Sequence, residues 1–261
     1  DRLYRDWKRQ GHGVVDLHRS IVESCDVFYY DLAHTLGIDR LSGFLRRFGF
    51  GQPTGIDIGG EAGGLMPTRE WKRRTRHEAW FPGETLITGI GQGFTLTTPL
   101  QMASTTAALA MRGQRMQPQV VQALEDSGGG NRETVPNVPL EPVGVKHSDN
   151  WDRIFKAMKQ VVHGARGTAR RIGYDAPYHI AGKTGTAQVF GIAQDAKYVK
   201  EDVAKLLRDH ALFIGFAPVE DPQIAVGVIV ENGGSGGAVA APIARQVMDR
   251  HLIDGQKEET P

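Results

Sequence analysis

The segment Ala181–Thr186 combines an ammonium group, two hydroxyls and two glycines, a set of groups suited to binding an anion. One interpretation is a phosphate-binding P-loop, which also contains Gly-Lys-Thr. A P-loop requires another glycine five positions before Gly182, and Pro177 occupies that position. A P-loop also leads from a strand into a helix, whereas a strand-like pattern continues here to Phe190. The sequence therefore argues against a P-loop.

The alternative for this segment is the Lys-Thr-Gly element of serine acyltransferases that act on penicillin-like substrates. In that arrangement a strand lies along the acyl substrate, and Lys183 and Thr184 face the substrate carboxylate. Gly185 lacks a Cβ and so lets the substrate backbone approach closely. The backbone N–H of Thr186 would donate to the oxyanion of the tetrahedral intermediate. A chance tetrapeptide in an edge strand is the other explanation.

The tripeptide Ser24-Cys25-Asp26 fits the Ser-x-Asn element of the same enzymes, in the variant that carries Asp. The Ser24 hydroxyl would carry a proton to the leaving amine, and Asp26 would bind a substrate amide. Such tripeptides are common by chance. This one comes about 160 residues before Lys183, on a predicted helix ahead of a predicted sheet. We therefore take Ser24 and Asp26, with Lys183 and Thr186, as candidate catalytic residues.

The spacing of apolar residues predicts the elements that position these groups. We expect helices over residues 16–36, 38–48, 97–111, 148–164 and 241–252. We expect strands over residues 178–190, 210–217 and 223–231, the last two forming an antiparallel hairpin. An amphipathic segment, 195–208, separates the first two strands, and residues 128–130 form a loop tip. Helices followed by an antiparallel sheet and a closing helix predict an α+β fold.

Composition excludes several classes of protein. The 261 residues include 31 Lys+Arg and 30 Asp+Glu, a net charge of +1 that argues against binding nucleic acid or anionic lipid as the main role. A hydrophobic fraction of 40% is typical of a globular chain. The longest apolar run, Ile224–Val230, is far shorter than the ~20 residues of a membrane helix. The single Cys25 cannot form an internal disulfide.

Longer blocks of sequence place the two motifs in a family. The chain resembles the class B penicillin-binding proteins of the elongation type, the penicillin-binding protein 2 family, over nearly its whole length. The blocks that carry the resemblance are 19–30, 37–41, 48–51, 54–57, 66–71, 89–93, 98–102, 183–190, 207–210 and 231–234. It implies the penicillin-recognising transpeptidase fold, shared with serine β-lactamases: a central antiparallel sheet with helices on both faces. It also implies D-alanyl-D-alanine transpeptidation, which crosslinks peptidoglycan during cell elongation and is blocked by β-lactams.

The family's nucleophile lies in a Ser-x-x-Lys motif, in which the lysine activates the serine. The residues three positions after the seven serines are Glu23, Val27, Leu45, Ala107, Gly130, Trp151 and Ala238, so no serine here has this motif. We therefore expect the nucleophile and the first strands of the sheet to precede Asp1. Residues 1–261 would then be the C-terminal portion of one transpeptidase domain, inactive alone.

The resemblance also implies partners and a location. The partners would be the peptidoglycan stem peptide, β-lactams, the N-terminal part of the same protein, and a membrane glycosyltransferase and elongation-complex proteins of the RodA and MreC type; no nucleic acid is expected. The location would be the periplasmic face of the bacterial inner membrane, with the anchor outside this chain. A penicillin-sensing receptor domain and a non-catalytic binding subunit of a wall-synthesis complex are the alternatives.

Asp6, His12 and Cys25 form a second candidate site. Carboxylate, imidazole and thiolate together suit Zn²⁺, and some members of the resembled family hold a structural zinc beside the active site. A fourth ligand would come from upstream, from Asp16 or from His18. A buried free thiol is the other interpretation of Cys25. The chemistry itself is expected to need no cofactor.

Overall fold

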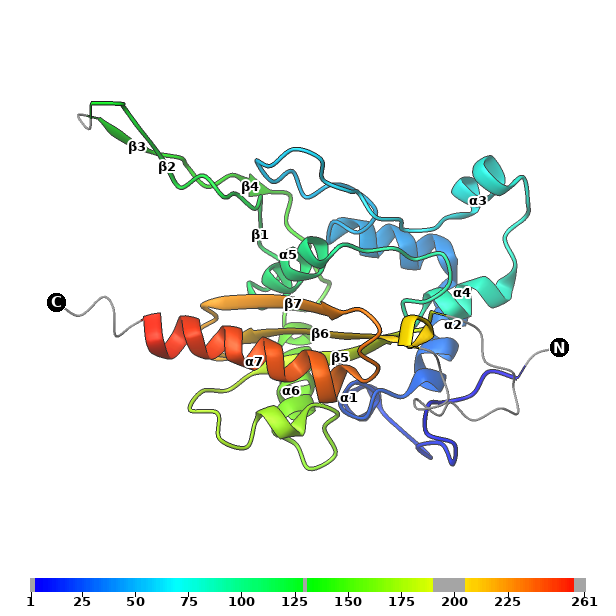
Figure 1. Ribbon diagram of the computed structural model, residues 1–261. Coiled ribbons are helices and arrows are strands. Elements are labelled where there is room, and N and C mark those ends of the chain that lie inside the picture. The colour runs from blue at the N-terminus through cyan, green and yellow to red at the C-terminus, as the bar shows by residue number, and fades with distance from the viewer. Residues whose placement is uncertain (1–2, 129–130, 190–204, 256–261) are drawn as a thin grey trace.

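A three-stranded antiparallel sheet lies at the centre of the computed structural model, which describes residues 3–128, 131–189 and 205–255 (Figure 1). Its strands, in the spatial order β5-β6-β7, are β5 (Ala181–Ala187), β6 (His210–Ala217) and β7 (Ile224–Val230). These are the three predicted strands, and β6 and β7 form the predicted hairpin. Phe190 and most of the predicted amphipathic segment 195–208 lie outside the described residues.

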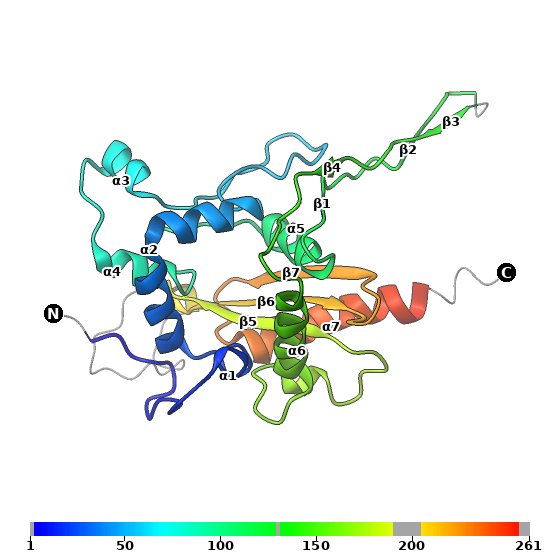
Figure 2. The ribbon, with the colours of Figure 1, turned by 180° about the vertical axis from the view of Figure 1, so that it is seen from behind.

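Helices cover both faces of this sheet, as Figures 1 and 2 show from opposite sides. Helix α6 packs on one face against β5, α7 packs on the other face against β6 and β7, and α5 packs against β7. The helices are α1 (Leu17–Val22), α2 (Asp26–Arg47), α3 (Arg69–Arg76), α4 (Pro82–Thr88), α5 (Pro99–Ala110), α6 (Asp149–His163) and α7 (Ala241–Asp249). The expected α+β layering is confirmed.

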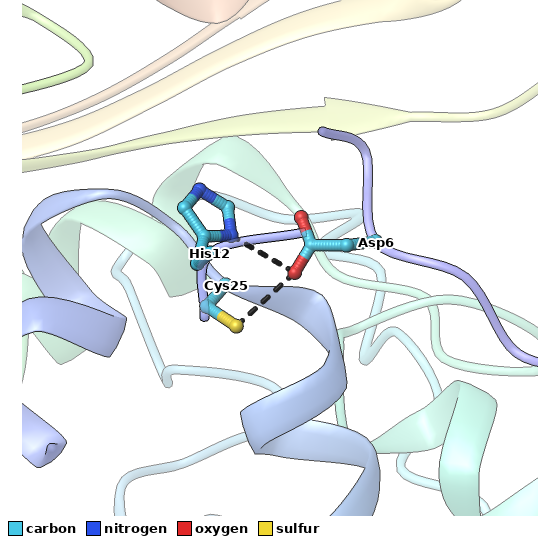
Figure 3. Close-up of side chains that lie close together, drawn as sticks. All are labelled: Asp6, His12 and Cys25. Atoms are coloured by element: carbon cyan, nitrogen blue, oxygen red, sulfur yellow. Dashed lines mark hydrogen bonds and ion pairs between the residues drawn. The ribbon is translucent and has the colours of Figure 1, made fainter. Parts of the chain in front are cut away.

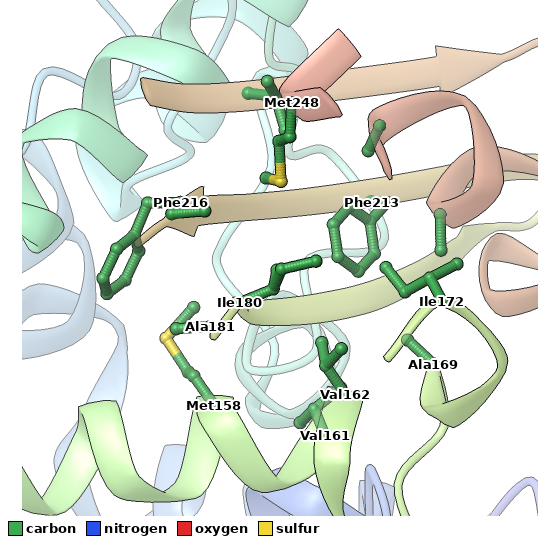
Figure 4. Close-up of a cluster of buried hydrophobic side chains, with 14 of the residues drawn as sticks. Met158, Val161, Val162, Ala169, Ile172, Ile180, Ala181, Phe213, Phe216 and Met248 are labelled. Atoms are coloured by element: carbon green, nitrogen blue, oxygen red, sulfur yellow. The ribbon is translucent and has the colours of Figure 1, made fainter. Parts of the chain in front are cut away.

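The main hydrophobic core lies between the sheet and these helices (Figure 4). Phe213 and Phe216 of β6 are fully buried, and the ring of Phe216 meets Phe155 of α6 edge-on with the centroids 5.0 Å apart. Val161 of α6 and Met248 of α7 are fully buried on the two sides of the sheet. The apolar stripe predicted on residues 148–164 therefore faces the core, and β5 is held on a well-packed platform.

The continuous helix predicted over residues 16–36 is wrong. Helix α1 ends at Val22 and α2 begins at Asp26, and Ser24 between them has a left-handed backbone with φ +56°. The N–H of Cys25 donates to the carbonyl of Ser20 over 3.0 Å, the hydrogen bond that closes a Schellman motif at the end of a helix. Ser24 thus lies on a turn between two helices, Cys25 is the N-cap of α2, and Asp26 is the first residue of α2.

Other element predictions agree with the structure in most details. Helix α5 begins as expected, with the Thr98 hydroxyl accepting the N–H of Gln101. The hydroxyl of Ser148 before α6 forms no such capping bond within the described residues. Gly37, at φ +72°, marks a kink within α2 where the sequence predicted a boundary.

The remaining strands form two small antiparallel pairs, and the longer pair extends away from the body of the molecule (Figure 1). These strands are β1 (Arg115–Met116), β2 (Ala123–Glu125), β3 (Arg132–Thr134) and β4 (Pro139–Leu140). The turn between β2 and β3 contains the predicted loop tip, of which residues 129–130 lie outside the described part. Among the described residues, no helix is both long and apolar enough to cross a membrane.

Candidate active site

The fold brings Lys183 of β5 against Ser24 in the turn between α1 and α2. The ammonium Nζ of Lys183 donates to Ser24 Oγ over 2.7 Å and to the carbonyl of Thr184 over 3.0 Å. The two motifs found in the sequence therefore meet in space, although about 160 residues separate them. Because the Ser24 oxygen accepts from the ammonium, its own hydroxyl proton is available to another group.

The charged groups at this site have pKa values shifted toward neutrality. Burial lowers the pKa of Lys183 to about 8, and the carboxylate of Asp26 opposes that shift. Burial and the nearby Asp6 carboxylate raise the pKa of Asp26 to about 6, against the backbone N–H of Trp7 and the Lys183 ammonium. Groups with such pKa values exchange protons easily near pH 7, as acid–base catalysis requires.

The outer edge of β5 is accessible to an extended ligand. Among the described residues, β5 pairs with a strand only on its β6 side. Thr186, at the far end of the segment, is exposed, and its carbonyl accepts a hydrogen bond from Gln92 Nε2 over 2.8 Å. Thr184 shares a hydrogen bond of 2.7 Å with the hydroxyl of Thr168. An edge of this kind can bind a peptide through its backbone groups.

Two residues at the site were not identified from the sequence. Gln92 reaches the edge of β5 from the loop after α4, where its side-chain amide donates to the carbonyl of Thr186. Trp7 braces the Ser-x-Asp turn: its indole N–H donates to the carbonyls of Ser24 at 2.8 Å and Glu23 at 3.2 Å. Its backbone N–H donates to Asp26 over 3.1 Å. No local pattern in the sequence indicates either long-range contact.

The three candidate metal ligands lie together behind this turn (Figure 3). Asp6 Oδ2 lies 3.0 Å from His12 Nδ1 and 3.1 Å from Cys25 Sγ. One ligand atom of each residue lies within 4.8 Å of the others. His12 and Cys25 are buried, and burial together with the hydrogen bond to Asp6 raises the pKa of the Cys25 thiol. Convergent oxygen, nitrogen and sulfur donors fit a structural zinc ion.

The proposed sources of a fourth ligand within the chain do not join this cluster. Asp16 caps the start of α1 by accepting the N–H of Arg19 over 2.7 Å. Neither Asp16 nor His18 belongs to the group of potential ligands found in the described part of the chain. The described residues thus offer three of the four ligands that structural zinc usually takes.

Comparison with known proteins identifies the family. Residues 1–249 match the model of the penicillin-binding protein transpeptidase domain. The chain belongs to this family. Peptidoglycan D,D-transpeptidase MrdA of Salmonella typhimurium strain LT2 is 41% identical over 265 residues, covering 99% of this chain and 41% of that protein. The chain thus spans about two fifths of the length of this curated relative.

Solved structures of the family share the fold. Penicillin-binding protein 2 of Pseudomonas aeruginosa, in complex with WCK 5153, has a TM-score of 0.83 and 50% identity, over 97% of this chain and 52% of that chain. Penicillin-binding protein 2 of Helicobacter pylori, in complex with MreC, has a TM-score of 0.79 and 30% identity, over 95% and 42%. The penicillin-binding transpeptidase fold expected from the sequence is confirmed.

Proposed function

We propose that the protein containing this chain is a peptidoglycan D,D-transpeptidase of the elongation type, acting through a serine acyl-enzyme and inhibited by β-lactams. The observation that carries the proposal is the hydrogen bond from Lys183 to Ser24 beside the exposed edge of β5. Residues 1–261 would be the C-terminal portion of the domain, with the Ser-x-x-Lys nucleophile upstream. Membership of the transpeptidase family and the resemblance to MrdA support this assignment.

In the proposed mechanism, the upstream serine gives its hydroxyl proton to the lysine of its own Ser-x-x-Lys motif and attacks the carbonyl of the penultimate D-Ala. The bond from that carbonyl to the last D-Ala nitrogen then breaks, and an ester to the serine forms. Ser24 gives its proton to the departing nitrogen and is resupplied by Lys183, whose pKa of about 8 permits the transfer. Lys183 and Thr184 would hold the substrate carboxylate, Thr186 would stabilise the oxyanion, and Asp26 would bind a substrate amide.

The test is covalent labelling of the complete protein with a fluorescent penicillin. We expect stoichiometric labelling at the upstream serine, and loss of nearly all labelling in Lys183→Ala. Lys156→Ala is the matched control, because Lys156 is an exposed lysine of α6. The isolated chain should remain unlabelled. Labelling of Lys183→Ala at the parent rate would refute the role of Lys183, and labelling of the isolated chain would refute an upstream nucleophile.

Turnover separates this proposal from the two alternatives. A transpeptidase should join a donor peptide to an acceptor amine and release D-Ala. Labelling by penicillin without crosslinking would favour a receptor domain, and the absence of both reactions would favour a binding subunit. We also propose the periplasmic face of the inner membrane as the location, with RodA and MreC type proteins as partners; the H. pylori relative solved with MreC supports that choice.

We further propose that Asp6, His12 and Cys25 hold a structural zinc ion, with a fourth ligand from outside the described residues. The ion would tie the N-terminal segment to the turn that carries Ser24, because Cys25 follows Ser24 directly. Metal analysis of the complete protein purified without chelator should give about one zinc per chain. His12→Ala and Cys25→Ser should destabilise it to a similar degree. Zinc below a tenth of an equivalent, with melting unchanged by chelator, would leave Cys25 as a buried thiol.

A further inference from the structure

A pocket of about 540 Å³ opens beside the Ser-x-Asp turn and is lined mainly by the N-terminal segment, α1 and the loop after α6. Lys8, Arg19 and Arg166 line it, and so does Thr168. The pocket adjoins the candidate active site, because the Thr168 hydroxyl is hydrogen-bonded to Thr184 over 2.7 Å. It lies outside the set of groups assigned above to the acyl-transfer steps.

The lining of this pocket carries an excess of positive charge. Glu23, its only lining carboxylate among the described residues, accepts from Arg19 Nε at 2.9 Å and lies 3.4 Å from an Arg166 nitrogen. Two arginine side chains thus share one buried carboxylate, and Lys8 lines the same pocket, so that Lys8, Arg19, Arg166 and Glu23 together carry a formal charge of +2.

The three cations have different roles. Arg19 also donates to the carbonyls of Val14 and His12, so it is committed to the structure of the N-terminal segment. The side chain of Arg166 is 71% exposed and touches Glu23 only at the longer distance. Lys8 is also exposed. Arg166 and Lys8 can therefore turn toward an anionic ligand without breaking the local structure.

The position of the pocket decides which part of a substrate would reach it. On the proposed function, on which this inference rests, Thr184 lies at the part of the site that holds the carboxylate of the departing D-Ala. The other end of the β5 edge, at Thr186, is the end that Gln92 contacts. The acceptor amine must arrive from the side on which D-Ala departs, because it attacks the same carbonyl carbon. The pocket lies on that side.

We propose that this pocket binds a carboxylate of the acceptor peptide, with Arg166 and Lys8 as its specificity-determining residues. In the step that it serves, the acceptor nitrogen bonds to the carbonyl carbon of the acyl-enzyme ester. The bond from that carbon to the serine oxygen breaks, and one amine proton passes to the serine. The charge in the pocket takes no part in this exchange. It raises the local concentration of acceptors with a carboxylate near the amine.

The test compares two synthetic acceptor peptides that differ only in carboxylate against carboxamide, with the complete protein and a thioester analogue of the donor. The parent should use the carboxylate acceptor at a lower half-saturating concentration. Arg166→Gln should raise that concentration about tenfold for the carboxylate acceptor and much less for the carboxamide. Arg166→Lys should retain most of the preference. Arg153→Gln, an exposed arginine of α6 paired with Asp149, is the matched control.

The measurements distinguish a failure of the acceptor pocket alone from a failure of the proposed function. Penicillin labelling and melting temperature are measured for every variant, so that a folding defect is recognised, and Lys8→Gln provides a second variant. If the parent protein shows neither labelling nor transfer, the proposed function fails and this inference fails with it. If labelling and transfer are normal but Arg166→Gln and Lys8→Gln leave the preference for the carboxylate unchanged, only the acceptor pocket is refuted.

Discussion

Replacing Lys183 by methionine should make the protein more stable at pH 8 while abolishing its reaction with penicillin. Lys183 is a charged group held largely out of water, and its pKa of about 8 lies well below the usual 10.5. A lysine whose pKa is lowered by folding destabilises the native state wherever it is protonated in the unfolded chain. Methionine has a similar length and carries no charge, so it removes this penalty.

The magnitude follows from the pKa shift. The fall in the pKa of Lys183 from 10.5 in the unfolded chain to about 8 in the native state corresponds to roughly 3 kcal/mol at or below pH 8. The methionine variant also lacks the two hydrogen bonds that Lys183 donates to Ser24 and to the carbonyl of Thr184. Their loss lowers the free energy of unfolding by about 1–2 kcal/mol. We expect a net gain of about 1–2 kcal/mol at pH 8. The penalty on the parent fades as pH rises from 8 to 10.5, so the gain should shrink by about 2 kcal/mol at pH 10.

The assay is urea unfolding of the parent and Lys183→Met at pH 8 and pH 10, followed by tryptophan fluorescence. Asp26, with a pKa of about 6 in the parent, is ionised at both values, so its titration adds little to the difference. Lys156→Met on the surface of α6 is the control and should show no change with pH. An effect of Lys183→Met that is equal at both pH values would refute the reasoning.

Three further substitutions test other parts of the site and its support. The Ser24→Gly protein should be about 1 kcal/mol more stable than the Ser24→Ala protein, because glycine adopts the left-handed backbone at φ +56° without strain. Both variants should lose crosslinking activity in a transfer assay. Asp26→Asn should raise the free energy of unfolding only above about pH 4, and the gain should be complete above pH 6, because the raised pKa of Asp26 makes its ionised form unfavourable in the native state. Denaturant unfolding of the parent and the variant at pH 4 and pH 7 measures this gain. Phe213→Ala should cost about 3–5 kcal/mol in denaturant unfolding, because the fully buried ring supports β5 from β6.

The sheet, including the strand that carries Lys183, could be predicted because the signals for its strands are local. Residues 210–217 and 224–230 are short apolar runs bounded by turn residues, and each forms a strand close to its predicted bounds. The segment around Lys183 is more polar, and its strand is shorter than predicted. The Lys-Thr-Gly motif indicated a role for this segment through the types and order of its side chains. Such a motif can be identified even where the alternation of apolar and polar residues is weak.

The contacts that build the site could not be predicted, because they join segments far apart in the chain. Gln92 and the carbonyl of Thr186 are separated by 94 positions, and Trp7 and Ser24 by 17. Lys72 has basic neighbours at Arg73 and Arg74, yet only 1% of its side chain is exposed. It pairs with Glu84 at 2.5 Å and lies over the ring of Phe81. The spacing of apolar residues along the chain does not predict such pairings between distant polar side chains.

The turn at Ser24 shows why the local pattern failed to predict the backbone at this candidate catalytic residue. The residue after the C-cap of a helix that ends in a Schellman motif is usually glycine, because it adopts positive φ. Here that position is a serine, so no glycine marks the end of the helix, and the helical spacing of apolar residues continues past it. A left-handed serine costs about 1–2 kcal/mol and persists only where surrounding contacts hold it.

Those contacts are present on each side of Ser24. The Trp7 indole binds its carbonyl, the Cys25 N–H closes the turn onto Ser20, and Lys183 binds its hydroxyl. Glycine would relieve the backbone but would remove the only hydroxyl, among the described residues, to which Lys183 donates. The strained residue at this turn therefore places its hydroxyl at β5, where Lys183 donates to it. The neighbouring cluster of Asp6, His12 and Cys25 is joined to the same turn through the hydrogen bond from Cys25 to Asp6, and a metal ion held there would add to the bracing that Trp7 provides.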